Sequence, residues 1–125
     1  MHEHRIQTRW ADFDALGHVT HSAYPVFFDE ARDACLAGLV GGFEQWPSVI
    51  VHSSIDYRRE IPRPAAEVLV HTRIAEVGRT SVTFEQELSA GDGVSATCRS
   101  VIVAWDGDAR AARPITDDER AKLAG

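Results

Sequence analysis

The spacing of apolar residues predicts one long helix in the first third of the chain. Within residues 22–40, apolar side chains recur at steps of three and four, the period of a helix with one buried stripe. Ser22 is a suitable N-cap, Pro25 falls in the first turn, and Gly41-Gly42 follows the last apolar position. The predicted stripe consists of Tyr24, Phe27, Phe28, Ala31, Cys35 and Leu39, whereas Asp29, Glu30, Arg32 and Asp33 lie off it.

Most of the remaining chain alternates between apolar and polar residues, which is the period of strands. Glycine turns at 78–79 and 91–93 separate the last three strands, and with the strand before them we expect an antiparallel meander. A capping box from Thr116 to Glu119 predicts a short C-terminal helix. The predicted strands cover residues 4–10, 48–58, 67–77, 80–89 and 94–105.

One long helix against a curved antiparallel sheet of about five strands is an α+β architecture. The length of 125 residues corresponds to a single domain, which we assign to residues 1–125. One helix covers only one face of such a sheet. We therefore expect a homo-oligomer, either a dimer or a tetramer, to cover the other face.

Composition narrows the possible partners and the compartment. The net charge of −6 argues against nucleic-acid and anionic-membrane binding. Cys35 and Cys98 lie in apolar contexts without CxxC spacing, so we expect reduced, buried thiols. The start of the chain carries no signal-peptide pattern, and no apolar run approaches the ~20 residues of a membrane span. These features predict a cytoplasmic protein.

The chemistry-bearing residues are concentrated just before the predicted helix. Two carboxylates (Asp12 and Asp14), a glycine and two histidines (His18 and His21) lie within ten residues there. Free N–H groups project from a helix N-terminus, so a carboxylate facing them is suited to acyl chemistry, with the N–H groups holding an oxyanion. The alternative is that both aspartates only satisfy loop N–H groups. A metal site is a further alternative, but the spacing matches no helix-borne metal motif, so we expect no metal.

These residues also carry a family resemblance. The string from Arg9 to Val19, followed by Tyr24 and Glu30-Ala31-Arg32, resembles the opening of the 4-hydroxybenzoyl-CoA thioesterase-like group of hotdog-fold acyl-CoA thioesterases. Segments 55–59 and 78–82 are similar to that family in order and spacing, so the resemblance covers roughly residues 5–105.

The resemblance implies a hotdog fold, in which the curved sheet wraps around the long helix, and a hydrolase that cleaves acyl-coenzyme A. It implies Asp14 as nucleophile or general base, and the backbone N–H of about His21 as the group that polarises the thioester carbonyl. It implies no cofactor other than the coenzyme A of the substrate. Thr20 and His21 stand where family members usually carry asparagine or an aromatic residue, so the preferred acyl group stays open.

Several further residues are candidates for contacts with the substrate. His18 is a candidate general acid or substrate contact, with loop organisation as the alternative. Arginine side chains suit the phosphates of coenzyme A, and the alternative is surface arginines paired with Glu60 or Glu67. The polar residues after the turn at Gly78 either reach the pantetheine or only begin a strand. The candidate binding residues are Tyr24, Arg58, Arg59, Arg63, Arg79, Thr80 and Ser81.

Three other functions compete with this hypothesis. Hotdog hydratases and dehydratases carry an Asp-x(4)-His pair, whereas only three residues separate Asp14 from His18. A non-catalytic acyl-CoA or small-ligand binding module would keep the arginines and tolerate loss of Asp14. A purely structural dimer would leave the polar string at 12–18 unexplained.

Overall fold

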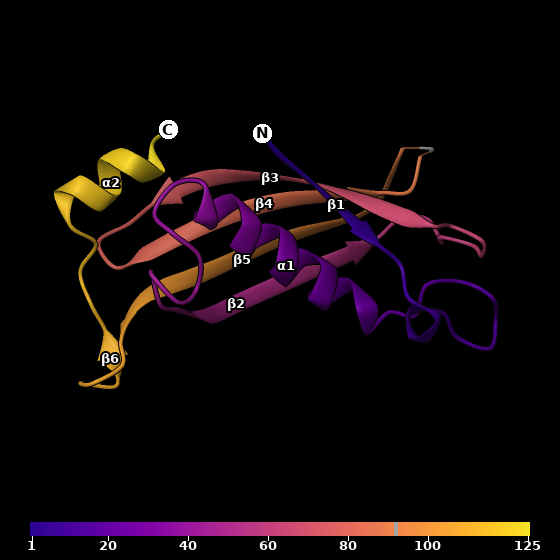
Figure 1. Ribbon diagram of the computed structural model, residues 1–125, viewed down its shortest axis with the longest axis horizontal. Helices are drawn as coiled ribbons and strands as arrows, with labels where there is room; N and C mark the ends of the chain where they lie inside the picture. The colour runs from indigo at the N-terminus through magenta and orange to yellow at the C-terminus, as the bar shows by residue number, and fades with distance from the viewer. Residues whose placement is uncertain (92) are drawn as a thin grey trace.

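A long helix lies across one face of an antiparallel sheet in the computed structural model of the chain (Figure 1). The structure describes residues 1–91 and 93–125, so Asp92 of the predicted turn at 91–93 lies outside the described residues. The elements in chain order are β1 (His2–Gln7), the 3-10 helix η1 (Trp10–Asp12), α1 (Ala23–Ala37), β2 (Ser48–Tyr57), β3 (Glu67–Val77), β4 (Ser81–Ser89), β5 (Val94–Asp106), β6 (Ala111–Ala112) and α2 (Asp117–Leu123).

The strands follow the order β1-β3-β4-β5-β2, and the two-residue β6 pairs with β5. The hairpins β3-β4 and β4-β5 confirm the later part of the predicted meander. The expectation that β2 belongs to the same meander is wrong, because β2 pairs with β5. β1 occupies the outer edge of β3, from Glu67 to Thr72, so β2 joins the opposite edge of the sheet.

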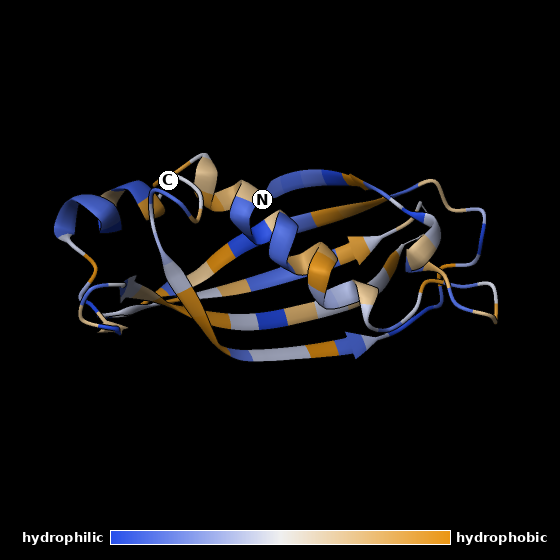
Figure 2. Ribbon diagram, turned by 60° about the horizontal axis from the view of Figure 1, so that its bottom comes forward, coloured by the Kyte–Doolittle hydropathy of each residue, from blue (hydrophilic) through white to orange (hydrophobic). Residues whose placement is uncertain are grey.

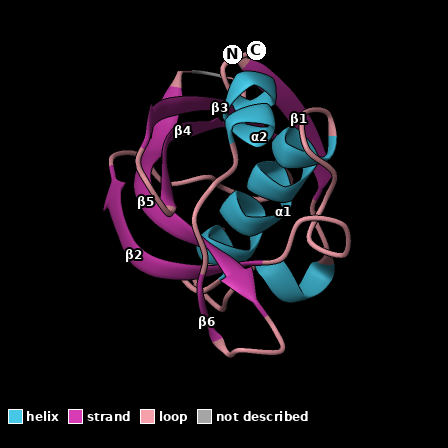
Figure 3. Ribbon diagram, turned by 90° about the vertical axis from the view of Figure 1, so that its left-hand side faces the viewer, coloured by secondary structure: helices cyan, strands magenta, loops and turns pink. Residues whose placement is uncertain are grey.

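The predicted apolar stripe of α1 forms the centre of the core. Tyr24, Phe27, Phe28, Ala31 and Cys35 are buried, and the aromatic members pack on the inward side chains of β3, β4 and β5. Figure 2 shows hydrophobic bands alternating with hydrophilic ones along the strands beneath the helix. Seen from the end, the sheet curves around α1 (Figure 3). This arrangement is the predicted α+β hotdog fold.

The first strand and its continuation differ from the prediction. β1 begins at His2 and ends at Gln7, instead of covering 4–10. Trp10, which the alternation placed with Ile6, lies in η1 and is 85% exposed. The chain turns there because the Asp12 carboxylate accepts a hydrogen bond from the Arg9 N–H (2.7 Å) and the Asp12 N–H donates to the Arg9 carbonyl.

The long helix is shorter than predicted. α1 ends at Ala37 with Gly38 as C-cap, not at residue 40. The N–H groups of Leu39, Val40 and Gly41 all donate to the carbonyl of Leu36, so the chain leaves the helix one turn early. Ser22 occupies the N-cap position, but its side chain makes no capping hydrogen bond.

Arg32 was predicted to lie off the apolar stripe, and this is wrong. Its side chain is buried between α1 and the sheet, with Phe28 and Leu36 one turn to either side. The guanidinium donates to the Gln86 side-chain oxygen and the Ser100 hydroxyl, both at 3.2 Å, and pairs with Asp29. These partners explain why the buried charge is tolerated.

The C-terminal helix and the cysteines agree with the sequence. Thr116 and Glu119 form the predicted capping box at the start of α2. Cys35 and Cys98 are both free thiols and buried, and burial raises the pKa of each. Within residues 1–91 and 93–125, no helix has the length and apolar character needed to cross a membrane.

Candidate active site

The loop before α1 is fixed by backbone pairing with the segment that follows β2. The N–H of Val19 donates to the carbonyl of Ile61 (2.9 Å), and the N–H of Arg63 donates to the carbonyl of Gly17 (2.8 Å). His18 and Pro62 form an isolated antiparallel bridge between them. Gly17 has a φ of +80°, a conformation that side-chain-bearing residues rarely adopt. This pairing brings together two polar segments that lie about forty residues apart in sequence.

Asp14 lies in this loop with both carboxylate oxygens in contact with donors. Oδ1 accepts a hydrogen bond from the Leu16 N–H (3.0 Å), and Oδ2 lies 3.2 Å from Nε2 of His18. The Asp14 side chain is 33% exposed, so it is oriented by these contacts and still reaches solvent. These are the requirements for a carboxylate that acts on a bound substrate or on water.

His18 lies between two carboxylates. Its Nδ1 is 2.9 Å from Oε2 of Glu60, and its Nε2 faces Asp14. The hydrogen bond with Glu60 raises the pKa of His18 above its usual 6.5, burial opposes this, and the charge of Asp14 adds to it. The protonated imidazole is therefore favoured at this position.

The residues just before α1 reach the same cleft through His21. Among the described residues, no group accepts a hydrogen bond from the N–H of His21. The Tyr57 hydroxyl donates to the carbonyl of His21 (3.3 Å), and the Tyr57 ring packs edge-on against Tyr24 with centroids 5.0 Å apart. The end of β2 thus fixes the backbone at the start of the helix, whose dipole favours negative charge there.

These groups line one cleft of about 350 Å³. It brings together six of the predicted site residues and adds Tyr57 and Glu60, which were not predicted as site residues. Tyr57 belongs to the segment 55–59 that resembles the family, but it was not singled out there. Glu60 was considered only as a partner of surface arginines. The lining residues are Asp14, His18, Val19, His21, Tyr24, Tyr57, Arg58, Arg59 and Glu60.

Four predicted binding residues lie outside this cleft. The Arg63 guanidinium lies over the ring of Phe13, 4.9 Å from its centroid. Arg79, Thr80 and Ser81 lie at the turn between β3 and β4, beside α2 and at the opposite end of the molecule (Figure 1).

The strand register gives the size of this separation. Ser81 pairs with Val103 of β5, whereas Tyr57 of the cleft pairs with Ala96. Seven residues of strand correspond to about 23 Å. One chain therefore does not bring the turn at Arg79 to its own cleft.

Asp12 differs from Asp14 in every respect. Its side chain is 2% exposed and accepts hydrogen bonds from the backbone and the guanidinium of Arg9. Burial alone would raise the pKa of Asp12, but the bonds and charge of Arg9 outweigh it and lower the pKa. Asp12 is thus a structural hydrogen-bonding residue, as expected for one of the two aspartates.

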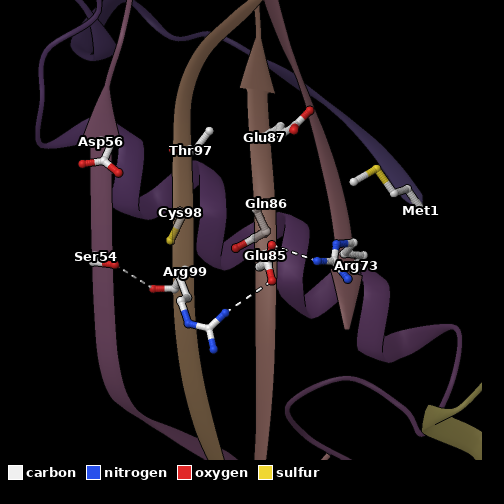
Figure 4. A pocket seen from close by; sticks show the side chains of 10 residues that line it. All are labelled: Met1, Ser54, Asp56, Arg73, Glu85, Gln86, Glu87, Thr97, Cys98 and Arg99. Carbon is white, nitrogen blue, oxygen red and sulfur yellow. Dashed lines mark hydrogen bonds and ion pairs between the residues drawn. The ribbon is translucent and has the colours of Figure 1, made fainter. Parts of the chain in front are cut away.

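The outer face of the sheet carries a second polar depression, of about 250 Å³. Figure 4 shows it from the side opposite α1, where Glu85 lies between Arg73 and Arg99 and pairs with both (2.9 and 3.3 Å). The Glu85 carboxylate is thus occupied by two ion pairs, and Asp56 and Glu87 line the same depression. No group of three or more His, Cys, Asp or Glu side chains within residues 1–91 and 93–125 is arranged to hold a metal ion.

Comparison with known proteins agrees with the fold. The model of the thioesterase-like superfamily matches residues 8–123. A predicted thioesterase from Bacillus stearothermophilus is 31% identical, with a TM-score of 0.89 over 98% of this chain and 92% of its own. A Thermus thermophilus thioesterase complexed with coenzyme A and Zn is 25% identical, with a TM-score of 0.88 over 98% and 97%. No curated protein sequence matches the chain.

The chain therefore belongs to the thioesterase-like superfamily. It is a hotdog-fold thioester hydrolase, as the string from Arg9 to Val19 indicated.

Proposed function

We propose that this enzyme hydrolyses acyl-coenzyme A thioesters, with Asp14 as nucleophile or general base. The observation that carries the proposal is a cleft lined by both Asp14 and His21, whose N–H donates to no acceptor among the described residues. An acyl carbonyl bound between them would meet the carboxylate or its activated water on one side and an oxyanion donor on the other. The coenzyme A thiolate is a good leaving group, so the reaction requires no strong general acid and no metal.

Two arginines support coenzyme A as the carrier of the acyl group. Arg58 and Arg59 line the cleft of Asp14, and an adjoining cleft of about 520 Å³ shares Arg59 and Glu60 with it. The guanidinium groups beside these two clefts suit the phosphates of coenzyme A. The Thermus thermophilus relative, whose structure is a complex with coenzyme A, supports the same ligand class.

The aromatic residues Phe27 and Phe28 of α1 do not line a pocket for the acyl group. Phe27 and Phe28 are 2% and 1% exposed, so they are core residues, and only Tyr24 of the predicted stripe reaches the cleft. We propose a homodimer in which the partner completes the site. The edge strand β2 exposes Ile50, Val51 and Tyr57, and a second copy could bring its own Thr80 and Ser81 to the cleft of the first. A tetramer is the alternative assembly.

The experiment measures release of free coenzyme A from a panel of short, medium, long and aromatic acyl-CoAs. Asp14→Asn keeps the shape of the side chain and removes its charge, and we expect kcat to fall by about a hundredfold or more. Asp108→Asn, in the distant turn after β5, is the matched control and should keep full activity.

The outcomes separate the competing functions. Turnover by the wild type that is lost in Asp14→Asn supports the proposal and identifies the acyl class. Binding of acyl-CoA without turnover would favour a non-catalytic binding module. Equal turnover by both proteins would exclude Asp14 from the mechanism.

A further inference from the structure

We propose that Glu60 is a positioning residue that acts through His18 to hold Asp14 in its working orientation. This inference rests on the proposed function, because it concerns the same carboxylate. Glu60 follows β2 in the chain and has no place in the Asp-x-Asp-x-x-Gly-His string. The structure nevertheless places its carboxylate at the end of a three-member chain, Glu60–His18–Asp14.

The first support is the use of both nitrogens of one imidazole ring. Nδ1 of His18 lies 2.9 Å from Glu60, and Nε2 lies 3.2 Å from Asp14. Carboxylates only accept hydrogen bonds, and a neutral imidazole carries one N–H, so only the imidazolium donates to both partners. Glu60 therefore supplies the second acceptor that keeps a proton on each nitrogen.

The second support is the backbone frame around the chain. Residues 17–19 pair with residues 61–63 through the hydrogen bonds Val19–Ile61 and Arg63–Gly17. Glu60 directly precedes the paired segment, so its Cα has a fixed position relative to His18. The Glu60 side chain itself is 66% exposed, which means that the contact with His18, and not burial, orients its carboxylate.

The remaining charged and titratable groups of the cleft do not replace this contact. Arg58 and Arg59 line the same cleft, as do His21, Tyr24 and Tyr57. The hydrogen bonds and charges of the two carboxylates that contact the ring outweigh burial, so the pKa of His18 is raised. Removal of the Glu60 carboxylate should therefore lower the pKa of His18 measurably.

The consequence for Asp14 is a fixed direction for each oxygen. The Leu16 N–H holds Oδ1, and the protonated His18 holds Oδ2. The lone pairs that remain can accept a proton from water or approach the acyl carbon. When His18 loses its proton, the single remaining N–H can serve only one of the two carboxylates. Asp14 is then held less firmly, so activity should decline as the pH rises through the raised pKa of His18.

Glu60→Gln tests this proposal, because it keeps size and hydrogen-bonding capacity while removing the charge. We expect the NMR titration midpoint of His18 to fall by about one pH unit. We expect kcat at pH 8 to fall about tenfold, with KM within a factor of two and the alkaline limb of the pH profile moved to lower pH. Glu3→Gln is the matched control, because Glu3 contacts His71 at 2.9 Å away from the cleft.

Each outcome decides a specific point. An unchanged His18 titration, or an unchanged kcat and pH profile in Glu60→Gln, would overturn the positioning role while Asp14→Asn still reports the hydrolase. A change in KM alone would make Glu60 a substrate contact and would also overturn it. If the wild type hydrolyses no acyl-CoA, the proposed function fails, and the positioning role fails with it.

Discussion

Asp12 and Asp14 lie two residues apart, but their surroundings give one a structural role and the other a proposed catalytic role. Asp12 is enclosed and bonded by Arg9, whereas Asp14 is one-third exposed and faces a histidine. The sequence placed both in the loop before the helix, but their separation into two roles depends on which carboxylate the following turn encloses. A substitution of Asp12 should therefore lower the stability of the fold, whereas a substitution of Asp14 should lower activity and leave stability unchanged.

Asp12→Asn is expected to lower the free energy of unfolding by about 1–3 kcal/mol at pH 7, since it weakens buried charge-assisted hydrogen bonds with Arg9. The pKa of Asp12 is lowered in the folded protein. Its stabilisation is therefore present above the unfolded pKa and is lost as the pH falls through the folded one. Urea unfolding of both proteins at pH 7 and in acid checks this, with Asp14→Asn as the comparison that should retain stability. Equal stability at pH 7 would contradict it.

At the scale of elements, the hydrophobic periodicity predicted the features that depend on residues close in sequence. The stripe of α1 from Tyr24 to Cys35, the β3-β4 and β4-β5 hairpins and the capping box of α2 were correct for this reason. Leu39 of the predicted stripe lies beyond the end of α1. Arg32 was misassigned since its partners, Gln86 and Ser100, lie on distant strands. The pairing of β2 with β5 and the approach of Glu60 to His18 escaped prediction for the same reason.

The helix α2 is attached to the rest of the protein by the buried Leu123, by Arg120, which donates to the carbonyls of Val77 and Gly78, and by the Glu119 carboxylate. Glu119 accepts two hydrogen bonds from the Arg113 guanidinium (both 2.8 Å) and one from the Trp46 indole (2.6 Å). The bond with Arg113 is the main cause that lowers the pKa of Glu119 to about 2. A carboxylate with this many donors fixes the orientation of a helix of seven residues.

Glu119→Gln should lower the free energy of unfolding by about 1–3 kcal/mol at neutral pH, while the capping box can persist. Because the folded pKa lies below the usual 4.5, the stabilisation should disappear as the pH falls from about 4.5 to about 2. Thermal unfolding at several pH values measures the difference between wild type and variant. A difference that is constant with pH would exclude the carboxylate charge as its source.

At the scale of the whole molecule, the predicted site residues are divided between the two ends of the sheet. The cleft with Asp14 lies at one end of the sheet, and the turn with Thr80 and Ser81 lies at the other. The hydrophobic pattern predicted an α+β architecture, and the family resemblance implied the hotdog fold. The distance between these groups depends on strand register, which neither one gave. In the proposed dimer, the turn of one chain would lie at the cleft of the other.

Val51→Lys tests this assembly, because Val51 lies at the bulge of the edge strand β2 and is 58% exposed. We expect the wild type to have twice the protomer mass in analytical ultracentrifugation and the variant to dissociate, since a lysine charge disfavours burial in an interface. Ala109→Lys in the turn after β5 is the control and should leave the mass unchanged. A monomeric wild type would disprove the dimer.

The pairing of residues 17–19 with 61–63 has a consequence for how this enzyme can change. Main-chain groups make these bonds, so the side chains at positions 14, 18 and 60 contribute little to the frame that carries them. Substitutions at the three positions are therefore expected to cost little folding stability. Evolution on this scaffold can replace the reactive side chains one at a time, and so change the acyl substrate, while the protein still folds.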